Sequence, residues 1–487
     1  MKQEKKKPMT DTAYTNSSDE GRPVLFYCFL ALVAWLPLPL GSNRPWAWSI
    51  MEIGSFALLG LWMAAHWRAK GPASKALESA RIPLTALGLW LVSFLLQVIP
   101  LPSGLSELLS PASFAIQQFN SEGTRLLVTS VSLDKGATLS ALLKASSYSA
   151  LFFLTLVLAD THQKVKTMVR VMVLTGFGTA LYGLIMTLTG IEYIWWTPKE
   201  YYKGFVTGTF INKNHFAGFM EITIPLGIAI LMTDFHFASR PKDTFMDRAK
   251  KVMVSLLDKR GRMAAYVVIM FSALFLSSSR AGVASFFTAM FIAGLTISSM
   301  KTSRERERML APVVIVLALL SVIWLGLGSL PGRIAESELS FAGRTQAWEG
   351  SINAINDFFP LGAGAGAFQW IYPMYETEGY TRVYFDHAHN DYIEILVDQG
   401  VFGLIPLLIF FFSAQRRLYR GLKQRRDPMI RGAIFAAAAG SLSLAIHGLI
   451  DFNFQIPANA AYFFMTLALG IAAGSLKSRR NALAKSD

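Results

Sequence analysis

The chain has 487 residues, of which 53% are hydrophobic and only 16% are charged, and its mean hydropathy is +0.39. A typical soluble protein carries about 25% charged residues, so this composition excludes a set of water-soluble domains and indicates a protein of the lipid bilayer. The single cysteine, Cys28, excludes an intrachain disulfide and a cysteine-based metal site, and its apolar surroundings favour a buried thiol.

Long apolar runs predict the fold class, an all-α polytopic membrane protein. A transmembrane helix needs about 20 apolar residues, and the chain has twelve such runs that are nearly free of charge. Residues 23–476 are therefore expected to form one membrane domain between polar tails at 1–22 and 477–487. The predicted spans are 24–41, 46–65, 82–101, 141–159, 171–190, 214–233, 263–279, 281–300, 310–330, 396–414, 432–450 and 458–476.

The basic residues predict the orientation of these spans. The chain has 46 Lys+Arg and 32 Asp+Glu, so its net charge is +14. Of the 46 basic residues, 35 lie in the two tails and in alternate connections between the spans. Cytoplasmic segments are enriched in Lys and Arg, so both termini are expected in the cytoplasm. The positive charge is thus explained by topology, and nucleic-acid binding is not expected. The basic connections lie near 66–81, 160–170, 234–262, 301–308 and 415–431.

Three substantial loops are expected on the opposite face, at 102–140, 191–213 and 331–395. The first shows no recognisable chemistry. The second is aromatic, which favours an interfacial belt of rings, and it leads into Lys213, Asn214 and His215. The third is the longest and lies between the ninth and tenth spans. The rings of the second loop are Tyr193, Trp195, Trp196, Tyr201 and Tyr202.

Arg280 lies in the segment SSSRAG, where two spans leave almost no loop between them. An arginine beside hydrocarbon is unfavourable unless it is paired, lines a wet cavity or reaches the headgroups. One interpretation is a helix-end arginine that extends to the headgroups. The other is an anion clamp, because a guanidinium binds phosphate in a bidentate manner.

The third loop contains a second candidate cation, Arg344. The stretch that follows it has apolar residues at helical spacing, which predicts an amphipathic helix of about four turns. Arg344 would lie at the start of that helix, where backbone N–H groups also favour an anion. The alternating Gly362, Gly364 and Gly366 could present further N–H groups to phosphate, although glycine-rich turns are common.

His387 and His389 follow in the segment FDHAHND, where the third loop enters the membrane. Three interpretations remain open from the residues alone: a metal site with the flanking carboxylates, a general base, or a helix start capped by Asn390 or Asp391. Further on, Asp451 lies at the outer end of a span. An acidic residue in this position is more often the partner of an arginine than a catalyst.

These residues favour one chemistry, because basic side chains and a histidine gather on the outer face of a membrane domain. The substrate that fits is a lipid whose headgroup leaves with negative charge, above all a polyprenyl pyrophosphate. Arginines would stabilise the departing pyrophosphate, and a histidine would take the proton from an attacking hydroxyl.

Several motifs also resemble those of the O-antigen ligase and polymerase superfamily. The pattern of HN, nine residues, G, two residues and G resembles the ligase motif at the entry of a large periplasmic loop into the membrane. Leu404 departs from the small hydroxyl residues that often continue this motif. The matching blocks are 389–403, SSSRAG at 277–282, GRTQAW at 343–348, INKNHFAGFMEITIPL at 211–226 and HGLIDFNFQIPAN at 447–459.

The resemblance implies a glycosyltransferase of the bacterial inner membrane with its active site on the periplasmic side. Such an enzyme uses no cofactor or metal and takes a glycan from undecaprenyl pyrophosphate. The acceptor is lipid A–core for a ligase, which the motif favours, or a second lipid-linked repeat for a polymerase. The family roles fall on Arg280 and Arg344 as pyrophosphate contacts and on His389 as the base. The supporting residues are His387, Asn390, His215, Lys213 and Asp451.

Two other classes of protein compete with this interpretation. A secondary transporter would suit twelve spans with cytoplasmic ends, but it is expected to place charges near the bilayer midplane and to show two related halves. A structural scaffold would leave Arg280 and His389 without a purpose. The polar residues of this chain gather at the outer rim instead, which favours the transferase.

Overall fold

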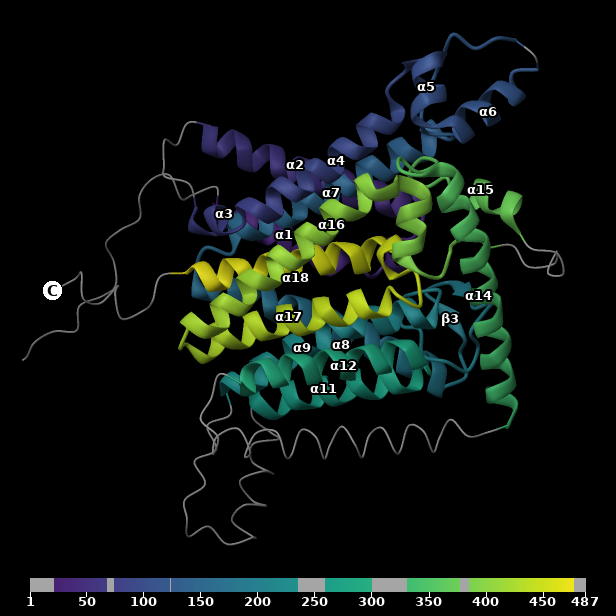
Figure 1. Cartoon of the computed structure of the whole chain (residues 1–487). Coiled ribbons are helices and arrows are strands. Elements are labelled where there is room, and N and C mark those ends of the chain that lie inside the picture. The colour runs from purple at the N-terminus through teal and green to yellow at the C-terminus, as the bar shows by residue number, and fades with distance from the viewer. Residues whose placement is uncertain are drawn as a thin grey trace, which may run out of the picture.

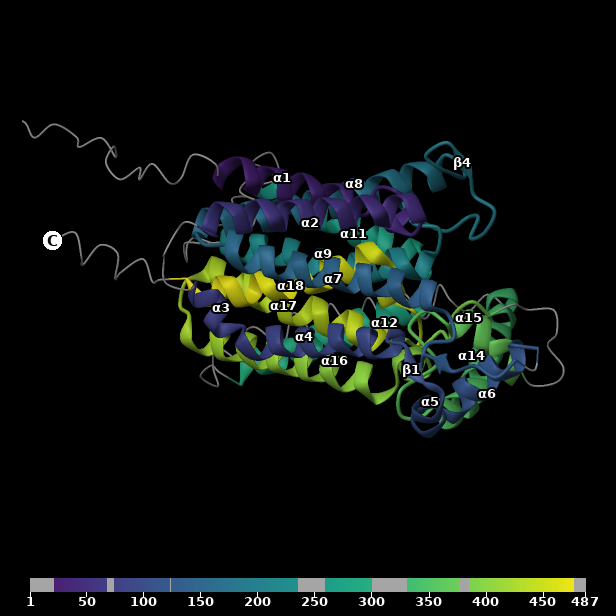
Figure 2. The same cartoon turned by 90° about the horizontal axis from the view of Figure 1, so that it is seen from above.

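The computed structural model describes residues 22–67, 74–122, 124–234, 259–299, 331–376 and 385–476. These residues form a bundle of long helices, and the shorter elements collect mainly at one end of it (Figure 1; Figure 2). Nine of the described helices are long and apolar enough to cross a membrane, and two more are apolar but shorter. The predicted helical membrane architecture is therefore confirmed in outline.

The order of helices follows the predicted spans closely. Eleven of the twelve apolar runs correspond to helices, whereas the run at 310–330 lies outside the described residues, so the count of twelve stays a prediction. The shorter apolar helices are α1 (Arg22–Trp35) and α11 (Lys259–Leu276). The longer ones are α2 (Pro45–Trp67), α4 (Arg81–Val98), α7 (Lys135–Leu158), α8 (His162–Leu188), α9 (Lys213–Asp234), α12 (Arg280–Ser298), α16 (Asp391–Gln424), α17 (Pro428–His447) and α18 (Pro457–Ser475).

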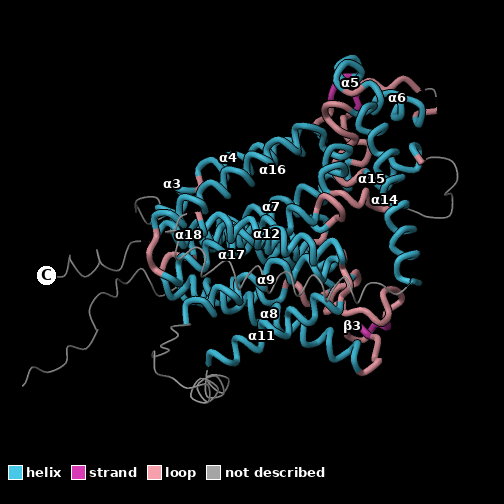
Figure 3. Tube along the Cα trace, turned by 60° about the horizontal axis from the view of Figure 1, so that its bottom comes forward, coloured by secondary structure: helices cyan, strands magenta, loops and turns pink. Residues whose placement is uncertain are grey.

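Elements of the three predicted outer loops all lie at the same end of the bundle (Figure 3). The short helix α3 (Lys75–Ser79) lies at the opposite end. Two antiparallel pairs, β1 with β2 and β3 with β4, stiffen the first and second loops. The remaining elements are η1 (Leu40–Ser42), β1 (Leu101–Pro102), α5 (Ser103–Leu109), α6 (Pro111–Asn120), β2 (Val128–Thr129), β3 (Tyr193–Ile194), β4 (Thr197–Pro198), α14 (Pro331–Phe358), α15 (Phe368–Ile371), η2 (Tyr372–Tyr375) and η3 (Asn453–Gln455).

The core lies where α9, α17 and α18 pack together. The apolar window of α18 is 89% buried and that of α9 is 83% buried, against 28% for α2 at the edge. Small residues permit this close packing, as in many membrane bundles. A side chain at Gly440 of α17 would lie 3.2 Å from the backbone of Ile222 on α9. The expectation of a buried thiol is wrong, because Cys28 on α1 faces outward and is exposed.

Helix α16 begins at Asp391, five residues before the predicted span, because Asn390 caps it and the outer loop merges with the helix. Gly400 interrupts the helix with φ of +59°, a conformation that other residues rarely adopt. A side chain there would also collide with the carbonyl of Pro360. The kink therefore lets the glycine-rich segment after α14 dock against α16.

Candidate active site

The Asp451 carboxylate, which is fully buried, is the centre of a polar cluster at the outer end of the bundle. Its Oδ2 accepts a hydrogen bond from Asn214 Nδ2 at 2.6 Å and lies 3.5 Å from Arg344 Nη2. Its Oδ1 lies 3.6 Å from His389 Nδ1 and 3.9 Å from His215 Nε2. These partners come from α9, from α14 and from the residues before α16. The structure thus brings together Asp451, Arg344, His389 and His215 from distant parts of the sequence.

Local hydrogen bonds hold the segment of His389 against the segment of Asp451. Asn390 caps α16 by accepting from the N–H groups of Tyr392 and Ile393, and its Nδ2 donates to the carbonyl of Leu449 at 2.8 Å. The N–H of Asp391 donates to the carbonyl of Gly448 at 2.8 Å. The helix-cap interpretation of Asn390 is therefore confirmed. The cap also supports the site, because it joins the start of α16 to the turn after α17.

The backbone of His389 is held in the left-handed region, with φ of +48°. Such a conformation costs about 1–3 kcal/mol for a residue other than glycine and persists only where its surroundings enforce it. The preceding residue, Ala388, is fixed on both sides. Its carbonyl accepts from Trp348 Nε1 at 3.0 Å, and its N–H donates to Glu394 Oε2 at 3.0 Å. The His389 side chain remains 25% exposed, so one part of the ring can meet a substrate.

The ring of Phe452, next to Asp451, contacts three histidines. His387 stacks on it with a centroid distance of 4.3 Å, and His389 and His215 meet it edge-on at 4.8 Å and 4.6 Å. Phe452 is buried and sets the spacing of the histidines around the carboxylate. The sequence reasoning did not select it, although it lies in the segment HGLIDFNFQ and follows Asp451 directly.

The charges of the cluster determine the protonation of Asp451. Burial raises the pKa of this carboxyl, but His389, Arg344 and His215 outweigh burial and hold the pKa well below the ordinary 3.8. A carboxyl with a lowered pKa stabilises the fold above its ordinary value and loses this contribution as the pH falls through the folded value. Asp451 is therefore an anion throughout the neutral range and can hold one face of His389 in place.

His387 has a different partner, Glu394, whose Oε1 lies 2.8 Å from His387 Nδ1. Burial lowers the pKa of His387, but the Glu394 carboxylate and its hydrogen bond outweigh burial, so the pKa lies above the ordinary 6.5. The stabilising effect of this pair is present below that value and is lost as the pH rises through the folded pKa. Within the described ranges, no group of three or more His, Cys, Asp or Glu side chains could hold a metal ion.

The prediction that Arg344 opens a helix is wrong. Helix α14 begins at Pro331, so Arg344 lies in its middle, where backbone N–H groups are already bonded within the helix. The helix is longer than the expected four turns, because it begins upstream of the apolar positions that predicted it. It crosses the outer end of the bundle (Figure 1). This crossing, rather than a helix terminus, directs the guanidinium toward Asp451.

Arg280 and Lys213 begin α12 and α9, at the same end of the bundle. Ser279 caps α12 through the N–H of Gly282, and a side chain at Gly282 would lie 2.7 Å from Ala217 Cβ. This contact places the first turn of α12 beside the first turn of α9, which carries His215. The Arg280 side chain is exposed. Lys213 extends its ammonium over the ring of Phe205, 3.9 Å from the centroid.

The glycine-rich loop at 362–366 does not present its N–H groups to a phosphate, which corrects that expectation. Those of Gly366 and Phe368 donate to the Asp398 carboxylate at 2.7 Å and 2.9 Å. The N–H of Gly364 donates to the Asp398 carbonyl, and that of Ala365 donates to Gln97 Oε1. The Asp398 side chain of α16 therefore occupies the N–H groups of Gly366 and Phe368.

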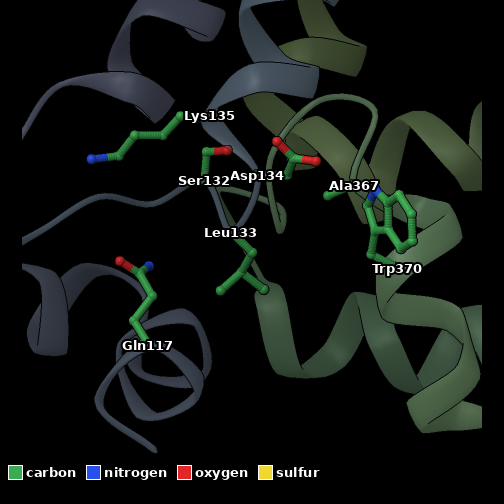
Figure 4. A pocket seen from close by; sticks show the side chains of 7 residues that line it. All are labelled: Gln117, Ser132, Leu133, Asp134, Lys135, Ala367 and Trp370. Carbon is green, nitrogen blue, oxygen red and sulfur yellow. The ribbon is translucent and has the colours of Figure 1, made fainter. Parts of the chain in front are cut away.

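Two cavities flank this loop. One of about 430 Å³ is partly open and lies between α4, α7, α16 and α18, and His387 is part of its wall. The other, of about 460 Å³, is open and lies among α6, the start of α7 and α15 (Figure 4). Trp370 and Gln117 border the open pocket, and the Lys135 side chain extends away from Trp370 (Figure 4). None of the predicted site residues lines the open pocket.

Residues 265–408 match the protein family described as O-antigen ligase. This range contains Arg280, Arg344, His387, His389 and Asn390, and it ends before Asp451. No curated protein matches the chain. The predicted resemblance to the O-antigen ligase and polymerase superfamily is therefore confirmed over the matched residues.

Proposed function

Since residues 265–408 match the O-antigen ligase family, we propose that the protein transfers a glycan from undecaprenyl pyrophosphate to an acceptor hydroxyl at the periplasmic face of the bacterial inner membrane. The family consists of bacterial membrane glycosyltransferases that act on lipid-linked glycans. The observation that carries the proposal is the position of His389, strained in its backbone and held between the Asp451 carboxylate and the outer surface.

In the proposed reaction, His389 acts as the general base. With Nδ1 turned toward Asp451, Nε2 is left to take the proton of the acceptor hydroxyl. The hydroxyl oxygen forms a bond to the anomeric carbon of the donor sugar as the bond from that carbon to the pyrophosphate oxygen breaks. Asp451 stabilises the imidazolium that results, in the way that an orienting carboxylate does in a catalytic triad.

The leaving group is undecaprenyl pyrophosphate, which gains negative charge as the bond breaks. Arg344 already lies in the cluster, and Arg280 lies at the same end of the bundle. Both are therefore assigned to stabilise the negative charge that develops on the pyrophosphate. Preorganised cations at the point where charge develops lower the barrier most effectively. No metal is assigned to the reaction, and metal independence stays a prediction.

Removal of either arginine should slow transfer strongly. We expect Arg344→Ala and Arg280→Ala each to lower kcat by about 10²–10³-fold, because each removes a cation from the leaving pyrophosphate. Lysine at either position should restore part of the rate, since it keeps the charge and loses the bidentate geometry. Arg125→Ala is the matched control, because Arg125 is an exposed arginine in the first outer loop. Unchanged kcat in the alanine variants would remove the arginines from the mechanism.

Ligase activity, with lipid A–core as the acceptor, is preferred to polymerase activity. The support for it is the HN-to-GxxG spacing at 389–403 and the description of the matched family. The alternative is a polymerase that joins lipid-linked repeat units of an O-antigen or exopolysaccharide. Leu404, which follows the second glycine, is the feature of the sequence that favours this alternative.

The proposed orientation places the Asp451 cluster in the periplasm and both termini in the cytoplasm. In a Cys28→Ser background, a cysteine at the exposed Asn120 of α6 should react with an impermeant thiol reagent in intact spheroplasts. A cysteine at the exposed Arg420, at the other end of α16, should react only after lysis. Labelling in the reverse order would overturn the orientation.

A further inference from the structure

Glu221 is a fully buried acidic residue in the span of α9, and the proposed reaction does not use it. It lies eight residues from the outer end of the helix at Lys213, which is a depth of about 12 Å along the helix axis. An acidic side chain inside a membrane span is unfavourable unless it is paired, and where it occurs it usually serves the function of the protein. The partners of Glu221 therefore indicate what it does.

Both oxygens of Glu221 are bound by side chains of α17. Oε1 accepts a hydrogen bond from His447 Nδ1 at 2.7 Å, and Oε2 accepts one from Ser443 Oγ at 2.6 Å. His447 is fully buried, and its Nε2 has no hydrogen-bond partner among the described residues. In this part of the chain, the bond to Glu221 is therefore what fixes the orientation of the imidazole.

His447 is the last residue of α17 and begins the turn that carries Asp451. Its carbonyl accepts from the N–H groups of Ile450 at 2.9 Å and Asp451 at 3.1 Å. Asp451 in turn is the carboxylate around which His389 and Arg344 gather. A change in the position of His447 is therefore transmitted to the Asp451 carboxylate through a short and hydrogen-bonded stretch of backbone.

The Glu221 carboxylate also borders the first turn of α12, which carries Arg280. A side chain at Gly282 would lie 3.0 Å from Glu221 Oε1 and 3.0 Å from the Oγ of Ser279, the N-cap of α12. Because glycine leaves this space free, Glu221 lies against the start of the helix, whose backbone dipoles favour a negative charge. Glu221 thus joins the turn of Arg280 to the turn of Asp451.

We propose that Glu221 and His447 are positioning residues for glycan transfer, which hold the Asp451 turn and the Arg280 turn in one fixed arrangement. The assignment rests on the proposed transferase function, in which His389 is the base and Arg280 stabilises the leaving pyrophosphate. Both groups must act on one anomeric carbon although they come from different helices, and small errors in such geometry slow a reaction strongly. Glu221 and His447 themselves touch no substrate, because both are fully buried.

Two pairs of variants test this role by keeping or removing the hydrogen bond. Glu221→Gln keeps an acceptor oxygen, and His447→Asn keeps a donor close to the position of Nδ1, whereas Glu221→Met and His447→Leu remove these groups. Glu221→Met and His447→Leu should each lower kcat per folded protein by about tenfold or more, with KM for both substrates within about twofold of the wild type. Glu221→Gln and His447→Asn should keep about a third or more of the wild-type kcat.

A purely structural role for the pair predicts a different result. It would lower the thermal midpoint of Glu221→Met and His447→Leu and leave the kcat of the folded protein unchanged, which would overturn the proposal. Equal losses of kcat in Glu221→Gln and Glu221→Met would also overturn it, because the hydrogen bond would then not be what matters. The matched control is Thr223→Val, since Thr223 is fully buried on the same helix and donates to the carbonyl of Phe219 at 3.0 Å. This variant should keep the wild-type kcat.

A distance measurement tests the positioning without measuring transfer. In a Cys28→Ser background, spin labels on cysteines at the exposed Ala284 and Leu449 report the separation of α12 from the Asp451 turn. The distribution of distances should be narrow with glutamate or glutamine at position 221 and broader or shifted in Glu221→Met. The same distribution in Glu221→Met would overturn the proposal. Failure of the proposed function would appear separately, as normal transfer by the His389→Asn variant, and the distance result would not depend on it.

Discussion

Replacement of His389 is expected to abolish glycan transfer while the protein still inserts and folds. Loss of a general base lowers the rate by about 10²–10⁴-fold. His389→Asn is the preferred variant, because asparagine tolerates the positive φ at this position better than alanine does. It therefore separates the loss of the imidazole from the loss of backbone structure. The measurement is transfer from a purified lipid-linked donor to acceptor in detergent.

The control for this variant is His162→Ala, which removes a histidine from the first turn of α8, outside the Asp451 cluster. It should transfer at the wild-type rate. Wild-type rates from His389→Asn, with the protein correctly inserted, would show that His389 is not the base.

Asp451→Asn should produce a loss of similar size for a different reason. The variant keeps the shape of the side chain but removes the charge that stabilises protonated His389, so kcat should fall by about 10²–10⁴-fold. It also leaves Arg344 without its carboxylate partner, so the thermal midpoint should fall as well. Both quantities can be measured on the same purified sample.

A double variant separates these two effects of Asp451. Arg344→Met combined with Asp451→Asn removes both charges, so it should regain much of the lost thermal midpoint while transfer stays abolished. If Asp451→Asn kept the wild-type kcat, the carboxylate would have no part in the mechanism and would serve only to anchor Arg344.

The sequence predicted the membrane helices well because their signal is local. A run of apolar residues must be helical in a bilayer, since every backbone group has to be bonded within the segment. Helix N-caps could also be predicted from the sequence, and Asn390 at the start of α16 is an example. The start of α14 could not be predicted, because the apolar positions that predicted the helix begin only at Trp348 and the residues before them carry no comparable pattern.

The residues of the candidate site were mostly named from the sequence, but their arrangement was not. Arg344 and His389 come from the third outer loop and Asp451 comes from the connection between α17 and α18, and no local pattern says which helices are neighbours. The glycine-rich loop shows the same limit. Its N–H groups were expected to bind phosphate, yet they bind Asp398, seven residues into α16. The role of Phe452 was also hidden, because a ring beside a carboxylate has no distinctive motif.

The measurement that tests the central claim most directly is a gel of cell-surface polysaccharide from a deletion strain complemented with wild type or His389→Asn. The transferase account predicts that the wild type restores normal glycans and that the variant does not. Long polymer retained on the undecaprenyl carrier, with bare lipid A–core, is the pattern expected for a ligase. Core with a single repeat, or loss of long exopolysaccharide, would make the protein a polymerase instead. Normal glycans in the uncomplemented deletion strain would contradict the account.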